Sequence, residues 1–193
     1  TIEPNTGVTY YRAPCPSVRL GKQALCTPRY GRLRQEDGTR FIPVQILDVA
    51  GLVPGASEGA GLGNKFLNDL CGADVLIHII DVSGTTNEKG EATTGYDPLN
   101  DADWLVDEIT TWVFNNLWGR WATVARRHSA TKASAVTTMQ GQLSGYGAAR
   151  ETINRLLDEC GVKDPVVLSD WDAGQVRALV DTFVKLRFPM VLL

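Results

Sequence analysis

Four residues, Asp48-Val49-Ala50-Gly51, form a D-x-x-G pattern directly after an apolar stretch at residues 41–47. An aspartate in this position could hold a magnesium ion through water, and a glycine leaves room for a backbone N–H to reach a phosphate. The pattern alone is a weak indication, because D-x-x-G occurs by chance in many chains. Its value depends on whether the surrounding elements would place both residues beside a bound phosphate.

The elements around this pattern predict an α/β fold. Residues 41–47 are expected to form a strand that ends at Asp48, and a glycine-rich loop covers residues 51–63. A helix is predicted over residues 64–70, and the nearly continuous apolar run 74–81 predicts a strand buried on both faces. Strand, loop, helix and strand in this order are typical of a parallel α/β sheet.

The part of the chain before residue 41 carries a further strand signal. Residues 7–12 are rich in β-branched and aromatic side chains, and Asp37-Gly38 predicts a hairpin turn before the strand at 41–47. Residues 14–30 are rich in proline and cysteine and are predicted to be irregular. Cys15 and Cys26 flank that stretch; we expect two free thiols, with a metal site or a redox pair as alternatives.

Residues 85–188 are predicted to be mostly helical. Apolar residues from Leu105 to Val124 recur at helical spacing, with Asn100 placed as a cap and Asp103 as a first-turn acid. Two further helices are expected at 133–143 and 149–160, and a fourth carries an apolar face of Val176, Leu179, Val180, Phe183 and Val184. The apolar residues 188–193 are expected to open another buried strand, so the chain is predicted to be a truncated piece.

The residues that flank the D-x-x-G pattern resemble a known family. The run DVAGLVPGASEGAGLGNKFL, from Asp48 to Leu67, and the opening residues Thr1-Ile2-Glu3-Pro4-Asn5 closely resemble Obg/YchF-type P-loop GTPases. The resemblance continues through Ala73 to His78 and, less specifically, through Tyr96-Asp97-Pro98. The long helical segment, including Arg126-Arg127-His128 and residues 188–192, is similar to a YchF-related branch of archaea and eukaryotes.

The resemblance implies an α/β P-loop NTPase core of the Ras-like G-domain type, incomplete here, with an α-helical insertion. Residues 1–98 would form a partial G domain with switch I, the D-x-x-G element, switch II and the following strand. Residues 99–187 would be the helical insertion, and residues 188–193 the start of the next G-domain strand. It also implies a cytoplasmic, magnesium-dependent nucleotide switch that acts with ribosomes or RNA.

The resemblance also assigns roles to single residues. Thr1 matches the switch I threonine, whose hydroxyl would ligate magnesium and whose amide would meet the γ-phosphate. Asp48 matches the magnesium-associated acid, and Gly51 matches the glycine at the γ-phosphate. Leu52 occupies the position where many GTPases place a water-orienting glutamine, and its alkyl side chain cannot orient water. Slow intrinsic hydrolysis, or a catalytic group supplied from elsewhere, is therefore expected.

Two motifs of such GTPases do not occur in these 193 residues. There is no GxxxxGK[ST] phosphate cradle, and Asn64-Lys65 is not a base-reading NKxD element because Leu67 stands where the aspartate is needed. Mg²⁺ and GTP are the cofactors expected for the parent protein, with ATP possible because the wider family includes an ATP-preferring branch. This chain alone is expected to bind no nucleotide tightly and to be inactive.

Charge is unevenly distributed in the predicted helical part. No Asp or Glu occurs from Ile109 to Arg150, a stretch whose cations include Arg120, Arg126, Arg127 and Lys132. These four side chains could contact RNA phosphates, or they could form a solvated basic face over a tryptophan-rich core, and both interpretations stay open. His78 is interpreted as a core histidine, and His128 as a helix-end or surface residue.

The composition leaves two classes of function open. A net charge of −3 argues against a globally basic nucleic-acid binder, and no apolar run is long enough to span a membrane, so no membrane contact is expected. The alternative to the GTPase is a non-catalytic RNA- or ribosome-binding module, either truncated or a degenerate paralogue. Without a first βα unit the sheet would have an open edge, which a partner or missing segments would have to cover.

Overall fold

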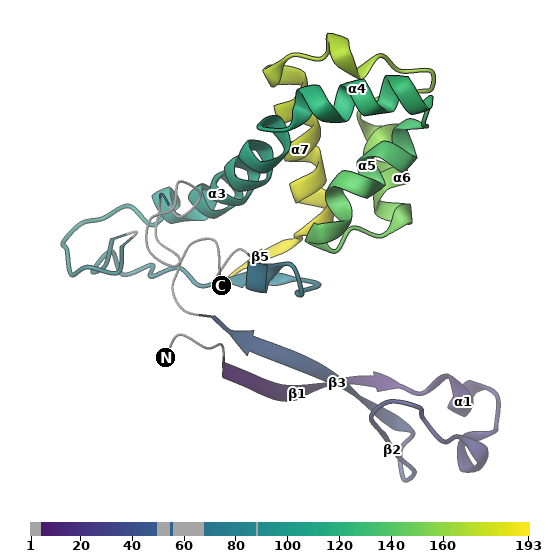
Figure 1. The fold of residues 1–193 in the computed structure, drawn as a ribbon. Helices are drawn as coiled ribbons and strands as arrows, with labels where there is room; N and C mark the ends of the chain where they lie inside the picture. Colours follow the sequence, from purple (N-terminus) through teal and green to yellow (C-terminus); the bar gives the residue numbers. More distant parts are fainter. Residues whose placement is uncertain (1–4, 50–54, 56–67, 88) are drawn as a thin grey trace. The chain divides into compact units, whose positions relative to one another are not determined.

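The computed structural model describes residues 5–49, 55, 68–87 and 89–193, apart from the side chain of Asp103 (Figure 1). Thr1, Gly51, Leu52 and most of the predicted 64–70 helix lie outside these residues. The chain divides into two units, Thr1–Gly51 and Leu52–Leu193, and each contains its own sheet. The predicted division into a G domain and an insertion at residues 98 and 99 stays a prediction.

The sheet of the first unit has β3 (Thr39–Asp48) between β1 (Asn5–Pro14) and β2 (Arg32–Arg34), and both pairs are antiparallel. The two predicted strands are confirmed and are longer than predicted. The predicted turn is confirmed as well: Gly38 has a φ of +69°, and the Asp37 carboxylate accepts hydrogen bonds from the backbone N–H and hydroxyl of Thr39. These bonds close the tight connection into β3.

The start of β2 depends on a glycine. Gly31 has a φ of +72°, and a Cβ atom at this position would lie 1.9 Å from the carbonyl oxygen of Phe41 in β3. Both the positive φ and the close approach of the two backbones require the absence of a side chain. Gly31 therefore allows the chain to turn into β2 directly against β3.

The segment between β1 and β2 is more ordered than predicted. It contains the short helix α1 (Pro16–Arg19) and a 3₁₀ turn, η1 (Gln23–Leu25). Cys15 is buried at the start of α1, and its Sγ lies 3.7 Å from Sγ of Cys26, with no disulfide between them. The Ser17 hydroxyl donates to the Cys15 thiol at 3.0 Å, and this bond lowers the pKa of Cys15.

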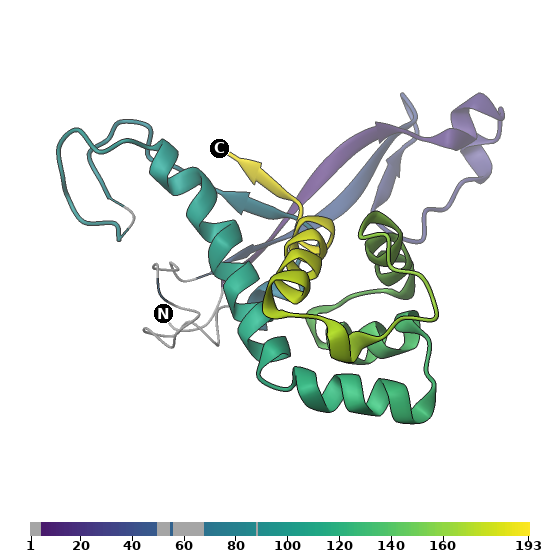
Figure 2. The same cartoon turned by 90° about the horizontal axis from the view of Figure 1, so that it is seen from above.

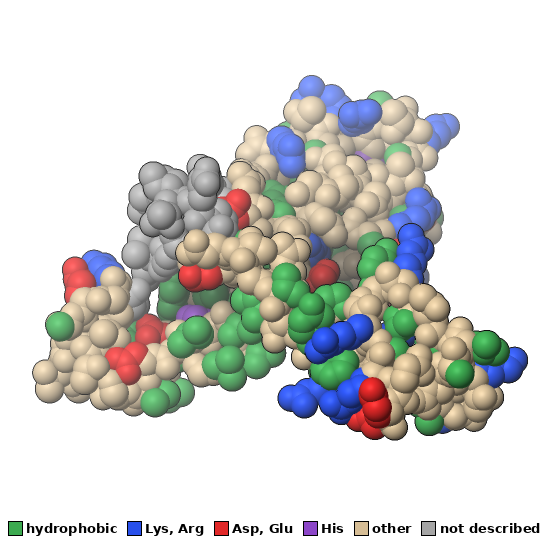
Figure 3. Space-filling view, turned by 90° about the horizontal axis from the view of Figure 1, so that it is seen from below, with side chains coloured by type: hydrophobic (Ala, Val, Ile, Leu, Met, Phe, Trp, Pro, Cys, Tyr) green, Lys and Arg blue, Asp and Glu red, His purple; other side chains and the backbone are tan. Residues whose placement is uncertain are grey.

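The sheet of the second unit pairs β4 (Leu76–His78) in parallel with β5 (Met190–Leu192). β5 confirms the strand predicted at residues 188–193. β4 is shorter than the predicted strand 74–81, and the prediction that it is buried on both faces is wrong. Leu76 is buried in the core, but Ile77 is 56% exposed, because the described residues leave the opposite face of this sheet open. Exposed hydrophobic side chains are visible in Figure 3.

Five helices of the described chain connect β4 to β5: α3 (Leu99–Trp118), α4 (Trp121–Thr131), α5 (Ala135–Leu143), α6 (Arg150–Glu159) and α7 (Ala173–Arg187). Two 3₁₀ turns, η3 (Ser144–Tyr146) and η4 (Leu168–Asp170), lie between them. Figure 2 shows α7 running beside α3, with which it makes extensive contacts. The helices predicted at 133–143 and 149–160 are confirmed within a few residues.

The helix predicted to carry apolar residues from Leu105 to Val124 is in fact two helices. Gly119 and Arg120 separate α3 from α4, and Arg120 has a φ of −120°, outside the helical range. The apolar spacing continues across this break because Trp121 and Val124 of α4 are buried in the same core as α3. Periodicity therefore predicted which residues are buried, but not where the helix ends.

The cap predicted at Asn100 is also wrong. α3 begins at Leu99, and the Leu99 N–H donates to the Asp97 carboxylate at 3.0 Å. Asp97 thus provides the acceptor for an N–H that has no partner inside the helix.

The helices share one apolar core, to which α7 contributes the predicted face. All five predicted residues are buried: Val176, Leu179, Val180, Phe183 and Val184. α7 begins with a capping box between Asp172 and Gln175, which satisfies the first N–H groups of the helix. Among the described residues, no helix has the length and apolar character that crossing a bilayer requires.

Candidate functional site

Asp48, the predicted magnesium-associated acid, is the last residue of β3 and has an exposed side chain. In the antiparallel register it faces Asn5, the first residue of β1. The described chain thus enters β1 and leaves β3 at the same end of the sheet, so strand pairing brings together the flanks of the Thr1 and D-x-x-G motifs. An accessible carboxylate can accept hydrogen bonds from the water molecules that Mg²⁺ keeps when it binds to proteins. Thr1, Gly51 and Leu52 themselves lie outside the described residues.

A contact that sequence reasoning missed links the glycine-rich segment to α3. The N–H of Gly55 donates to Oε2 of Glu108 at 3.3 Å. The two residues are 53 positions apart, and no spacing pattern in the sequence predicts their contact. The bond is a direct connection between the segment that follows D-x-x-G and the helical part of the second unit.

Asp81, which follows β4, organises its own loop. Its carboxylate accepts hydrogen bonds from the N–H and hydroxyl of Ser83 and from the hydroxyls of Thr85 and Thr86. These bonds hold the pKa of Asp81 well below its usual range, so the residue stays ionised. All the hydrogen-bond donors to Asp81 lie within five positions along the chain. Its carboxylate therefore stabilises the conformation of this loop.

The four cations proposed as RNA contacts are all exposed and lie around one helix. Arg120 precedes α4, Arg126 and Arg127 lie on its solvent side, and Lys132 is its C-cap. The opposite side of α4 buries Trp121, Val124, Ala125 and His128. Figure 3 shows lysine and arginine side chains over the far end of the helical part, with no acidic side chain among them on that face. The arrangement fits a polyanion contact and equally a solvated face.

The contacts of the two histidines are with structural neighbours in the helical part. His128 lies in the last turn of α4 as predicted, but it is buried and not on the surface. Its Nδ1 is 2.8 Å from the Thr138 hydroxyl, and its Nε2 is 3.1 Å from the Val166 carbonyl oxygen, so the ring joins three segments. His78 is half-buried with its ring edge against Trp104, and burial lowers the pKa of this imidazole.

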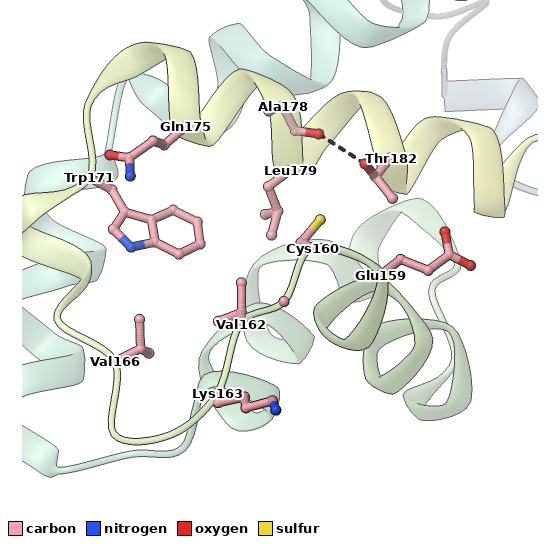
Figure 4. Close-up of a pocket in the computed structure, with 11 residues that line it drawn as sticks. Glu159, Cys160, Val162, Lys163, Val166, Trp171, Gln175, Ala178, Leu179 and Thr182 are labelled. Carbon is pink, nitrogen blue, oxygen red and sulfur yellow. Dashed lines mark hydrogen bonds between the residues drawn. The ribbon is translucent and has the colours of Figure 1, made fainter.

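A pocket of about 580 Å³ lies between the end of α6 and α7 (Figure 4). Trp171, Val162 and Leu179 line it, and the ring of Trp171 also stacks on Trp121 at 5.9 Å. The Thr182 hydroxyl points back to the Ala178 carbonyl oxygen of its own helix. None of the predicted site residues lines this pocket.

The described residues contain no group of side chains arranged to bind a metal ion. Within the ranges given above, no group of three His, Cys, Asp or Glu side chains could share a metal ion. Among the described residues, Cys15 and Cys26 therefore have no third His, Cys, Asp or Glu beside them that could complete a metal site. A magnesium site at Asp48 would draw on residues outside the described ranges and on the nucleotide itself.

Comparison with known proteins places the whole chain in one group. A GTP-binding protein of Schizosaccharomyces pombe is 47% identical over 192 residues, which cover 100% of this chain and 46% of that protein. A crystal structure of a GTP-binding protein from Pyrococcus horikoshii matches with a TM-score of 0.75 and 27% identity, over 97% of this chain and 48% of that one. The chain thus spans about half the length of these relatives. No family model matches it.

Bacterial proteins of two kinds, YchF and Obg, match shorter parts of this chain. The ribosome-binding ATPase YchF of Haemophilus influenzae is 38% identical over 113 residues, 56% of this chain and 27% of that protein. The GTPase Obg of Clostridioides difficile is 39% identical over 83 residues, 43% of this chain and 17% of that protein. Both the sequence matches and the structural match agree with the resemblance to Obg/YchF-type GTPases that the motifs indicate. The chain therefore belongs to the Obg/YchF-type GTPases, and its strands and helices follow the α/β fold of that family.

Proposed function

We propose that this chain supplies the switch residues of a magnesium-dependent GTP site. The observation that carries the proposal is the position of Asp48 at the end of β3, directly opposite the start of β1. In this arrangement Asp48 would hold Mg²⁺ through water, while Thr1 would bind the metal and the γ-phosphate and Gly51 would offer its N–H. The names of the relatives, which are GTP-binding proteins, support this assignment.

The proposed reaction is slow GTP hydrolysis by a longer protein that contains these switch residues. Leu52 has no polar atom in its side chain, so it can neither orient nor polarise an attacking water. Bound Mg²⁺ would neutralise charge on the phosphates, and the chain's own contribution would be positioning. The hydrogen bond between Gly55 and Glu108 would transmit a rearrangement of the glycine-rich segment to α3.

Asp48→Asn tests the magnesium role in a complete GTP site. We would replace the matching 192 residues of the S. pombe relative with this chain and titrate the chimera with fluorescent GTP. With Mg²⁺ present, Asp48→Asn should weaken binding by about 10- to 100-fold, because the amide cannot stabilise the metal's water shell as a carboxylate does. Without Mg²⁺, the two proteins should bind alike.

A matched control uses another aspartate. Asp37→Asn in the same chimera changes a carboxylate at the other end of β3, where it pairs with Arg34 and caps a turn. Its effect on nucleotide affinity should be less than about twofold, since it lies outside the proposed site. Equal affinities of the Asp48→Asn and unsubstituted chimeras in Mg²⁺ would contradict the assignment of Asp48.

We also propose that the solvent side of α4 contacts ribosomal RNA. Arg126 and Arg127 are exposed on adjacent positions, and no acidic residue occurs between Ile109 and Arg150. The H. influenzae relative is a ribosome-binding protein, which supports this partner. Phosphate contacts by such side chains release counterions and weaken as salt is added.

Arg126→Glu/Arg127→Glu should lower ribosome co-sedimentation by about tenfold or more at moderate salt, because two phosphate contacts are replaced by repulsion. Lys89→Glu/Lys163→Glu makes the same change in net charge at two exposed lysines outside α4 and should have little effect. If both double variants bind equally, the basic side of α4 is a solvated face and not an RNA contact.

A further inference from the structure

The N-terminal unit carries a second uneven charge distribution. Residues 5–34 contain no Asp or Glu, while they hold six cations: Arg12, Arg19, Lys22, Arg29, Arg32 and Arg34. Three exposed tyrosines, at positions 10, 11 and 30, lie in the same stretch. In a chain with a net charge of −3, this combination is a local feature and not a reflection of overall composition.

Strand register gathers part of this set on one face of the sheet. Residues directly opposite each other on antiparallel strands point to the same side. Phe41 of β3 faces Arg12 of β1 on one edge and Arg32 of β2 on the other, so these three side chains share a face. Tyr10, two positions before Arg12, lies on this face too, whereas Tyr11 lies on the opposite one. We call Tyr10, Arg12, Arg32 and Phe41 the sheet patch.

Arg32 packs against both aromatic rings of the sheet patch, and the two arginines and Tyr10 remain accessible. The Arg32 guanidinium lies 4.6 Å from the ring centroid of Phe41 and 6.0 Å from that of Tyr10. Such cation–π contacts hold the arginine in place without using its hydrogen-bond donors. Arg12 and Arg32 are exposed, Tyr10 is 50% exposed, and neither arginine forms a salt bridge with any residue in the described ranges.

We propose that the sheet patch binds single-stranded nucleic acid. The guanidinium groups of Arg12 and Arg32 would contact two backbone phosphates, and an unpaired base would stack on the ring of Tyr10. Stacking requires a base that is free of its own duplex, which favours a single strand over double-stranded RNA or DNA. An acidic protein segment would satisfy the arginines but would leave the aromatic ring without a matching partner. The sheet patch belongs to the first unit, whereas the solvent side of α4 belongs to the second.

The test is the affinity of the 193-residue chain for a fluorescent 12-nucleotide oligouridine RNA, measured by anisotropy at several salt concentrations. Tyr10→Ala should weaken binding by about 5- to 150-fold, the range that loss of one base–aromatic stack produces. Tyr10→Leu should do the same, although it keeps a bulky side chain on the strand. Tyr10→Phe should bind like the unsubstituted chain.

Tyr11→Ala is the matched control. It removes a neighbouring tyrosine that is 64% exposed on the opposite face of β1, and it should leave affinity within about twofold. Arg12→Glu/Arg32→Glu should weaken binding at least about tenfold and flatten its salt dependence, since two phosphate contacts are lost. Lys89→Glu/Lys163→Glu, which changes the net charge equally, should change neither the affinity nor its salt dependence. An oligothymidine of equal length, run in parallel, distinguishes RNA from DNA as the strand that binds.

Three outcomes would overturn the proposal: no measurable oligouridine binding, equal losses for Tyr10→Ala and Tyr11→Ala, or equal affinity for polyglutamate and oligouridine. The last would identify the patch as a general anion or acidic-peptide surface. Failure here is separate from failure of the α4 contact, because Arg126→Glu/Arg127→Glu should retain oligouridine binding at the sheet patch.

Discussion

Arg187→Met should lower the free energy of unfolding of the second unit by about 3–5 kcal/mol. The Arg187 guanidinium donates to three backbone carbonyl oxygens, those of Tyr146 at 2.8 Å, Ala73 at 2.8 Å and Cys71 at 2.6 Å. One side chain thereby joins the end of α7 to η3 and to the segment that enters β4. Methionine keeps most of the apolar contact but leaves these carbonyl groups without their donor.

The measurement is equilibrium unfolding in urea, followed by circular dichroism of the helices. Lys185→Met is the matched control: Lys185 lies two positions earlier on the same helix and forms an exposed ion pair with Asp181. Such pairs contribute about 0–1 kcal/mol, so this variant should change stability little. Arg187→Lys should be nearly as destabilising as Arg187→Met, because one ammonium group cannot reach all three carbonyl oxygens as the planar guanidinium does. A loss below about 1 kcal/mol for Arg187→Met would contradict the account.

Gly147→Ala should destabilise the same junction by about 2–4 kcal/mol. Gly147 has a φ of +74°, and a Cβ atom there would lie 2.5 Å from Nη2 of Arg187 and 2.9 Å from the Cys71 carbonyl oxygen. The added methyl group would therefore strain the backbone and displace the guanidinium from one of its acceptors. This position connects the backbone conformation of the turn to the hydrogen bonds of Arg187.

Gly145→Ala is the control for this substitution. Gly145 lies two positions earlier, within η3, and a Cβ atom there would meet nothing within 4 Å. It should change stability by less than about 1 kcal/mol. In a double-mutant cycle, Gly147→Ala should cost less in the Arg187→Met background, because the clash with the guanidinium is gone, although the backbone strain and the close approach to the Cys71 carbonyl oxygen remain. Additive losses would show that the two residues act independently.

The elements that the sequence predicted best are those whose buried faces repeat at a regular spacing. The α7 face from Val176 to Val184 was predicted residue by residue, because each of these side chains packs into one core. The break between α3 and α4 was not predicted, because Trp121 and Val124 keep the helical spacing across it. Spacing records burial, whereas the end of a helix is decided by the backbone at Gly119 and Arg120.

The prediction for β4 failed for a different reason. An apolar run predicts burial on both faces only if other elements cover both faces, and the described residues cover one. The same limit applies to contacts between distant segments: neither the Gly55 bond to Glu108 nor the three bonds of Arg187 follow from local patterns. A charge count would have found the acid-free stretch at residues 5–34, as it found the one at 109–150.

The candidate site was predicted from its motif, and the structure adds the strand pairing. The D-x-x-G pattern and its flanks identified Asp48, and the register then placed it opposite Asn5 at the end of β3. Roles for Thr1, Gly51 and Leu52 stay predictions. The relation between the switch residues and a bound phosphate depends on a cradle that these 193 residues do not contain.

A titration of the 193-residue chain with fluorescent GTP and fluorescent ATP, with and without Mg²⁺, tests the central claim most directly. Because these 193 residues contain no phosphate cradle beside the proposed switch residues, neither nucleotide should bind below about millimolar concentration, and Mg²⁺ should make no difference. The chimera with the S. pombe relative should bind GTP in a magnesium-dependent way under the same conditions. Micromolar, magnesium-dependent binding by the chain alone would contradict the account, because it would require a phosphate site built from residues other than those assigned here.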